Sequence, residues 1–187
     1  RKYLQDPEFL FFLGNTDPKK NTPGTLKAYA EYVRRSEKPL PLLVADLGEQ
    51  PAEAILREIG EPRLRGMLRL AGYIPNSDLP AIYNEASAFL YTSLRESFGI
   101  PQLEAMACGT PVVTSAASAI PEVAGQGAIL VDPTDPTAIA DALLRLETDA
   151  EFRAGQVAYG LERVKQFSWE KTARHLLALY ESLGKTN

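Results

Sequence analysis

The stretch that decides the fold is AFLYTSLRESFGIPQLEAMACGTPVVTS, residues 88–115. It opens with an apolar run at 88–93, passes through a loop that contains Gly99, and continues into a helical pattern beginning near Pro101. A second apolar run follows at 111–115. Short, fully apolar runs on either side of a helix are typical of a parallel β-α-β unit.

The same alternation extends over the whole chain. Four more apolar runs predict strands, at residues 9–14, 40–47, 67–74 and 128–132. Helical patterns occupy 25–36, 51–60 and 77–86, with Pro51 as first residue of the second and Ser77 as cap of the third. A later helix starts at Pro136 after its cap, Asp135, and two helical segments end the chain, the second opened by Ser168. Strands that are apolar along their whole length predict an α/β fold: one domain, residues 1–187, with a doubly wound parallel sheet of about six strands.

Composition narrows the class of protein. The 187 residues are 45% apolar and 24% charged, which is typical of a globular protein, and the net charge of −4 argues against a nucleic-acid partner. No apolar stretch approaches the roughly 18 residues of a membrane span. The single cysteine, Cys108, excludes an internal disulfide and suits a reducing, cytoplasmic location. Because the chain begins at Arg1, we expect a piece of something longer, although tag removal or processing would look the same.

Several familiar sites are absent from the sequence. It contains no G-x-G-x-x-G fingerprint, no P-loop and no G-x-S-x-G elbow. No Cys or His cluster could hold zinc. The lone His175 lies within the last helical pattern, where we expect a structural role, and Cys108 is expected to pack inertly at a helix end.

Ligands of doubly wound sheets bind at the carboxyl ends of strands, against helix N-termini, and two such junctions stand out. The first is GNTDPKKN, residues 14–21, directly after the first strand. Lys19 and Lys20 stand where a helix is about to start, so cation and helix dipole would both attract an anion. A solvated turn with two surface lysines is the alternative.

The second junction lies between residues 94 and 101. If Pro101 is the first helical residue, Ile100 before it has no side chain able to cap the helix, and Ser97 does not form a capping box. The helix would then begin with free N–H groups, which a bound phosphate could satisfy. Gly99 would let this backbone approach the ligand closely.

Glu96 and Glu104 frame this same N-terminus, the first in the loop and the second in the first helical turn. A phosphate would repel them, so their expected targets are neutral hydroxyls on either side of it. Hydroxyls flanking a phosphate describe a nucleotide-sugar, with ribose at one end and hexose at the other. The alternative is that Glu104 only complements the helix dipole and Glu96 is solvated.

These segments resemble the group 1 glycosyltransferases, retaining enzymes of GT-B architecture. ESFGIPQLE (96–104) matches their E-x7-E motif, and GNTDPKKN resembles their phosphate loop. Residues 71–93 and 104–143 resemble the segments that flank E-x7-E in this family, and 167–183 resemble its C-terminal helix. The resemblance covers most of the chain and implies a Rossmann-like sheet forming one half of a GT-B enzyme.

The resemblance implies a role for each motif residue. Glu96 would hold hydroxyls of the transferred sugar, Glu104 would hold the ribose diol, and Lys20 would neutralise the departing diphosphate, which makes Lys20 and Glu96 the catalytic pair. The remaining donor contacts would come from the backbone amides of Phe98, Gly99 and Ile100 at the diphosphate and sugar, and from Tyr73 and Ile74 beside the base.

One position departs from the family pattern. Asn15 stands where many members have arginine, so Lys19 or Arg95 is expected to supply the second positive charge. The family needs no metal and no cofactor, and D-x-D is absent here. The P-K-K-N form of the loop favours GDP-mannose or a similar donor, with a UDP-sugar as the other choice.

The resemblance also implies a missing half. The chain corresponds to the C-terminal, donor-binding domain, so the N-terminal acceptor domain would be its partner and the source of any peripheral membrane association. We therefore expect the complete protein to be a retaining hexosyltransferase and this domain alone to be inactive. A non-catalytic nucleotide-sugar binding module and an enzyme like a sugar-nucleotide epimerase or a phosphorylase remain the alternatives.

Overall fold

The computed structural model describes residues 2–184, so residues 1 and 185–187 of the predicted domain lie outside it. The described residues contain one six-stranded sheet in which every neighbouring pair is parallel. Its strands are β1 (Leu10–Leu13), β2 (Leu42–Ala45), β3 (Leu68–Gly72), β4 (Ala88–Tyr91), β5 (Val112–Ser115) and β6 (Ile129–Val131). The prediction of a doubly wound parallel sheet is confirmed.

The strand order is β3-β2-β1-β4-β5-β6. From β1 the chain builds outward to β3, then returns to the other side of β1 with β4 and builds outward again. In its register β1 pairs Leu10 with Leu42 of β2 on one side and with Ala88 of β4 on the other. The loops that follow β1 and β4 therefore lie side by side at the carboxyl ends of the strands. This is the point where the strand order reverses and where ligands of such sheets bind.

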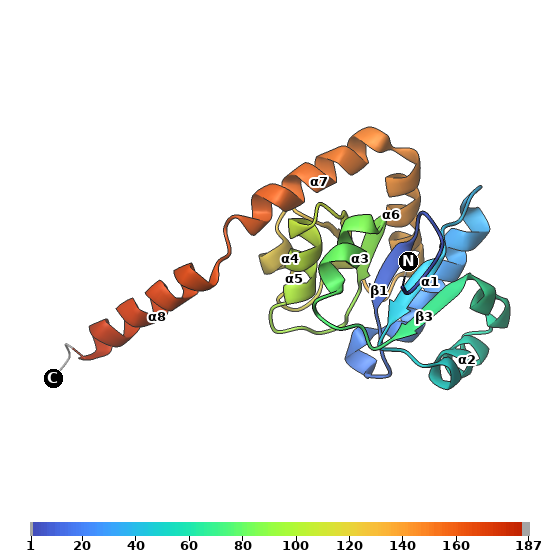
Figure 1. Cartoon of the computed structure of the whole chain (residues 1–187), viewed down its shortest axis with the longest axis horizontal. Helices are drawn as coiled ribbons and strands as arrows, with labels where there is room; N and C mark the ends of the chain where they lie inside the picture. Colours follow the sequence, from blue (N-terminus) through green and yellow to red (C-terminus); the bar gives the residue numbers. More distant parts are fainter. Residues whose placement is uncertain (1, 185–187) are drawn as a thin grey trace.

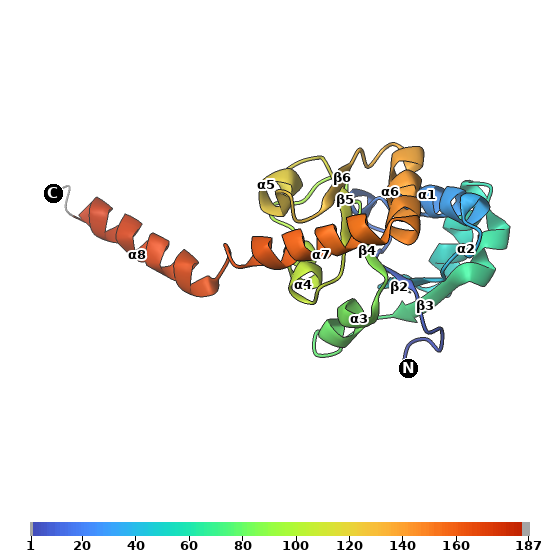
Figure 2. The same ribbon diagram turned by 90° about the horizontal axis from the view of Figure 1, so that it is seen from above.

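Helices cover both faces of the sheet (Figures 1 and 2). The helices of the described residues are α1 (Thr22–Arg35), α2 (Glu49–Glu58), α3 (Leu79–Glu85), α4 (Ile100–Ala107), α5 (Ile120–Ala124), α6 (Pro136–Thr148), α7 (Ala150–Val164) and α8 (Trp169–Gly184), of which α8 does not lie on the sheet. Two 3-10 turns, Pro18–Lys20 and Pro62–Met67, lie before α1 and β3. Neither these turns nor the short α5 was predicted, because segments this short carry too little periodicity to be recognised.

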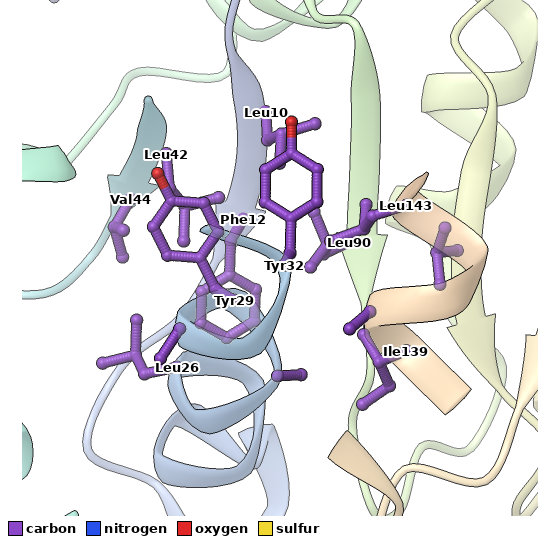
Figure 3. Close-up of a cluster of buried hydrophobic side chains, with 14 of the residues drawn as sticks. Leu10, Phe12, Leu26, Tyr29, Tyr32, Leu42, Val44, Leu90, Ile139 and Leu143 are labelled. Atoms are coloured by element: carbon purple, nitrogen blue, oxygen red, sulfur yellow. The ribbon is translucent and has the colours of Figure 1, made fainter. Parts of the chain in front are cut away.

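Alternate residues of each strand face opposite cores, because side chains point to alternate sides of a strand. Phe12 faces the core beneath α1, α2 and α6 and belongs to one buried cluster with Tyr29, Tyr32 and Leu143 (Figure 3). Phe11 faces the second core, beneath α3, α4 and α5. With both faces covered by helices, the loops at the carboxyl ends of the strands are where a ligand is expected to bind.

Four helix starts differ from the prediction. The first is that of α1, which begins at Thr22, three residues earlier than predicted. α2 begins at Glu49, so Pro51 is its third residue, and α4 begins at Ile100, so Pro101 is its second. The first N–H groups of a helix have no intrahelical partner, so proline marks the first turn without marking the first residue. α3 begins at Leu79 after Asp78, whose side chain makes no capping bond, and Ser77 is therefore not its cap.

The starts of α6 and α8 agree with the prediction. The Asp135 carboxylate accepts hydrogen bonds from the N–H groups of Thr137 and Ala138 at the start of α6. Ser168 Oγ accepts from the N–H of Lys171, 3.1 Å away, at the start of α8. These caps were predictable because each depends only on residues within one turn.

The last helix projects from the body of the domain (Figures 1 and 2). Every side chain from Trp169 to Leu183 is exposed, including the predicted apolar stripe of Ala173, Leu176, Tyr180 and Leu183. His175 lies on this helix and is exposed as well, so it has no part in a core. A stripe of this size on a helix that touches water is normally covered by a partner.

Candidate functional site

The loops after β1 and β4 bring together the two side chains that the sequence placed in separate motifs. Lys20 Nζ donates a hydrogen bond to Glu96 Oε1 at 2.7 Å, although the residues are 76 positions apart. Their side chains are 20% and 15% exposed, and the Lys20 ammonium also lies 5.4 Å from the centre of the Tyr91 ring. A cation, a carboxylate and a phenol ring therefore form one cluster where the strand order reverses.

The electrostatics of this cluster keep Glu96 ionised. Burial raises the pKa of its carboxyl group, but the hydrogen bond and charge of Lys20, assisted by Ser93 and Tyr91, outweigh burial and hold the pKa below its usual value. Burial, together with the neighbouring Glu96 charge, raises the pKa of Tyr91. Tyr91 therefore remains a neutral hydroxyl beside an ionised pair.

The loop that carries Glu96 is held at three points. Leu94 N–H donates to the carbonyl of Lys19 at 2.8 Å, which joins this loop to the loop after β1, residues 14–21. Ser118 Oγ, in the loop after β5, donates to the carbonyl of Glu96 at 2.7 Å. Gln102 Nε2, in α4, donates to the carbonyl of Phe98 at 3.4 Å. These bonds pre-organise the loop. Neither Ser118 nor Gln102 was singled out in the sequence: Ser118 acts from 22 positions away, and the Gln102 bond, although local, belongs to no capping pattern.

The N-terminus of α4 has no side-chain cap, as predicted, although the capping position is Gly99 and not Ile100. Gly99 has φ 86°, a conformation that favours glycine. A Cβ atom there would also lie 2.8 Å from Gln102 Nε2 and 3.2 Å from the Tyr91 ring. The flanking residues Phe98 and Ile100 are 43% and 45% exposed, so the start of α4 is open to a ligand.

Glu104 lies on the same helix but not where the sequence placed it. Because α4 starts one residue early, Glu104 is the fifth helical residue and falls in the second turn. Glu104 is exposed as a residue, and its carboxylate accepts a part-buried hydrogen bond from the Tyr83 hydroxyl at 3.3 Å. The alternative interpretation, in which Glu104 only complements the helix dipole, loses support, because the effect of the dipole fades beyond the first turn.

A hollow of about 260 Å³ lies beside α4, at the carboxyl ends of β1, β2 and β3. Its lining includes Tyr73, Ile74, Ile100 and Glu104, so four predicted donor-binding residues meet there. Tyr73 is 75% exposed, whereas Ile74 is buried in the wall. The hollow is also lined by Asp46, which was predicted to lie within the strand at 40–47. The strand ends at Ala45, and the φ of 58° at Asp46 marks it as a turn residue.

Lys19 and Asn15 serve the loop itself in this structure. Lys19 Nζ lies 3.2 Å from Asp17 Oδ2 and its side chain is 53% exposed. Asn15 Oδ1 accepts from the Asp17 N–H at 2.9 Å, and the Asn15 carbonyl accepts from Thr22 Oγ1 at 2.6 Å. Arg95 is exposed in the other loop. That Lys19 or Arg95 supplies a second positive charge beside a phosphate stays a prediction.

Two further observations bound the site. Within residues 2–184 no three His, Cys, Asp or Glu side chains gather closely enough to hold a metal ion. None of the helices in this part of the chain is both long and apolar enough to cross a membrane.

Fold and site define the class: a doubly wound α/β domain with charged loops and an uncapped helix N-terminus where its strand order reverses. Residues 2–163 match the family described as "Glycosyl transferases group 1". The chain therefore belongs to the group 1 family of glycosyltransferases, and the resemblance found in its motifs is confirmed.

Similar proteins agree with this assignment. O-antigen chain mannosyltransferase B of Escherichia coli is 34% identical over 94% of this chain, which covers 46% of that relative. A sucrose-phosphate synthase from Thermosynechococcus elongatus has a TM-score of 0.80 at 27% identity, over 97% of this chain and 47% of its own. Anabaena HepE, solved in complex with UDP and glucose, has a TM-score of 0.75 at 19% identity, over 94% of this chain and 48% of its own. This chain thus spans about half the length of each, and the fold is that of GT-B glycosyltransferases.

Proposed function

We propose that this chain is the donor-binding half of a retaining glycosyltransferase that moves a hexose from a nucleotide diphosphate sugar to an acceptor. The observation that carries the proposal is the Lys20–Glu96 pair, 2.7 Å apart where the strand order reverses. A cation and an ionised carboxylate at one point suit a ligand that is anionic on one side and rich in hydroxyls on the other. A sugar diphosphate has that composition.

The diphosphate lies between Lys20 and the start of α4 in this proposal. Backbone amides of Phe98, Gly99 and Ile100 donate to it and to the sugar, and the positive end of the helix dipole adds to their effect. Lys20 turns from Glu96 to the phosphate and stabilises the charge that develops as the diphosphate leaves. Lys19 or Arg95 supplies a second cation, while Asn15 shapes the loop.

The nucleoside occupies the hollow beside α4. Tyr73 is a flat, exposed surface on which a base can stack, Ile74 forms the wall, and Glu104 accepts hydrogen bonds from the ribose diol. Asp46 favours guanine there, because the adjacent N1–H and N2–H groups of guanine match the two oxygens of a carboxylate. Uracil presents one such donor between two carbonyl oxygens, which a carboxylate would repel.

The chemistry of transfer follows from this placement. Glu96 holds hydroxyls of the hexose, so that the bond from the anomeric carbon to the diphosphate oxygen breaks while the acceptor oxygen bonds to the same face. The acceptor proton leaves with the diphosphate, and the configuration is retained. The mannosyltransferase relative supports mannose as the hexose and GDP-mannose as the preferred candidate donor. A UDP-sugar is the second candidate donor, because HepE was solved with UDP and glucose.

The acceptor would be held by a second, N-terminal domain of the same protein. This chain covers 46% of the mannosyltransferase relative, which leaves room for such a half. The exposed apolar stripe of α8 offers it a surface. We place the complete protein in the cytoplasm, and any contact with a membrane would be made through that other half.

Calorimetry with GDP, UDP, ADP and TDP, alone and as their sugars, tests the proposal on this chain. We expect a nucleoside diphosphate to bind, with GDP binding most tightly. Lys20→Met should lower this affinity, whereas Lys38→Met, at an exposed lysine beyond α1, should leave it unchanged. If the chain bound none of these four nucleoside diphosphates, the proposal would be overturned. The full-length protein then separates the alternatives: a non-catalytic module gives no product with any acceptor, and an epimerase converts the sugar without one.

A further inference from the structure

Asn21, the last residue of the P-K-K-N segment, has no role in the proposed chemistry, yet it occupies an unusual position. Its N–H donates to the carbonyl of Pro18 at 3.1 Å and ends the 3-10 turn that carries Lys20. Its carbonyl accepts from the N–H of Thr25 at 2.9 Å and begins α1. The backbone is left-handed, with φ 57° and ψ 33°. Asn21 is thus the joint between the turn of Lys20 and the helix behind it.

The side chain of Asn21 ties this joint to two other strand ends. Nδ2 donates to the carbonyl of Thr92, directly after β4, at 3.1 Å, and to the carbonyl of Pro133, between β6 and α6, at 2.7 Å. Asn21 is only 9% exposed, so water competes little for these bonds. Thr25 Oγ1 adds a contact of 2.6 Å to Thr92 Oγ1. The loops after β1, β4 and β6 are therefore joined at one amide.

Asparagine fits this place for reasons that other residues do not share. It tolerates a positive φ better than other residues with a side chain, apart from aspartate. Its amide offers two N–H donors to two carbonyls, where the oxygens of an aspartate would be repelled. A Cβ atom on Gly24 would lie 2.3 Å from Asn21 Oδ1, so the first turn of α1 leaves space for the amide.

We propose that Asn21 is the positioning residue for Lys20. It holds the turn of Lys20 at a set distance from the loop of Glu96, since Thr92, its acceptor, starts that loop. Lys20 itself is anchored in a turn of three residues, Pro18–Lys20, and Asn21 is its next neighbour. The inference rests on the proposed function, because it concerns how the diphosphate finds its cation.

A double-mutant cycle measured by calorimetry with GDP and UDP tests this role. Asn21→Gly keeps the left-handed backbone but removes both donors, and we expect it to weaken binding of the nucleoside diphosphate about tenfold or more. In a Lys20→Met background the same change should have almost no further effect, because the cation that it positions is gone. Binding of guanosine or uridine, which lack phosphate, should not change in either background.

Two controls separate positioning from a loss of folding. Ser36→Ala removes a side-chain bond at the other end of α1 and should lower the unfolding temperature without changing diphosphate affinity. Gly24→Ala presses a methyl group on the Asn21 amide without changing Asn21, and should reproduce the binding loss if Asn21→Gly does not fold. If Asn21→Gly weakens binding by the same factor with and without Lys20, the positioning role is wrong. If the unchanged chain binds no nucleoside diphosphate, the proposed function fails first and the inference with it.

Discussion

Replacing Glu96 by glutamine should tighten the binding of free nucleoside diphosphate. In this structure Lys20 is already engaged by Glu96 at 2.7 Å, in surroundings where the two side chains are 20% and 15% exposed. A diphosphate has to draw Lys20 away from that carboxylate and then remain close to its negative charge. Glu96→Gln keeps the shape of the side chain and removes this charge, so the competition for Lys20 weakens.

The expected size follows from the geometry. A phosphate oxygen in contact with Lys20 would stand roughly 6 Å from the Glu96 carboxylate, where two unit charges repel by about 1.4–2.8 kcal/mol at an effective dielectric constant of about 20–40. Because a glutamine carbonyl still accepts a hydrogen bond from Lys20, we take the lower figure, which corresponds to about tenfold tighter binding. The sugar should show the opposite effect: losing a charge-assisted bond to a hydroxyl costs roughly 1.5–3 kcal/mol, so the advantage of the nucleotide sugar over the free nucleotide shrinks.

Calorimetry on the unchanged chain, Glu96→Gln and Asp6→Asn would measure this. Asp6→Asn breaks a comparable ion pair, since Asp6 Oδ2 lies 2.9 Å from Arg69 Nε with side chains 29% and 34% exposed, but it is remote from the site. It should leave diphosphate affinity unchanged. If Glu96→Gln weakens the binding of free nucleotide, Glu96 contacts the nucleotide itself. The assignment of Lys20 to the diphosphate and of Glu96 to the sugar would then be wrong.

Four other predictions follow from the same site. Glu104→Ala should lower the affinity for free nucleotide about ten- to hundredfold, because the hydrogen bonds to the ribose are lost. If the variant and the unchanged chain bind free nucleotide equally well, Glu104 does not bind the ribose. Nucleotide binding should survive a chelator; affinity lost with chelator and restored by magnesium or manganese would show that a metal takes part. Since the pKa of Glu96 is lowered on folding, its stabilising effect is present above the ordinary value of 4.5 and lost as pH falls below it. The unfolding temperatures of the unchanged chain and Glu96→Gln should therefore converge in acid, and a constant gap would contradict this. The chain alone should transfer no sugar, and turnover near 1 per second would mean that residues 1–187 hold a complete site.

Much of this protein could be derived from local sequence pattern. Runs of apolar residues predicted all six strands, and caps such as Asp135 and Ser168 predicted helix starts, because each depends on neighbours within a few positions. The parallel sheet followed from strands apolar on both faces. The two junctions with charged or uncapped ends were visible for the same reason: a strand, its loop and the next helix are adjacent in the chain.

The order of the strands could not be derived in this way, and it decides the site. Placing β4 beside β1 brings Glu96 to within 2.7 Å of Lys20 across 76 positions, and it puts Tyr73 and Glu104 around one hollow. Strand order depends on how distant helices share two cores, and no periodicity within a segment records that choice. The amide of Asn21 shows the same limit: its neighbours in sequence indicate a turn, but its acceptors follow β4 and β6, and only the assembled sheet brings them together.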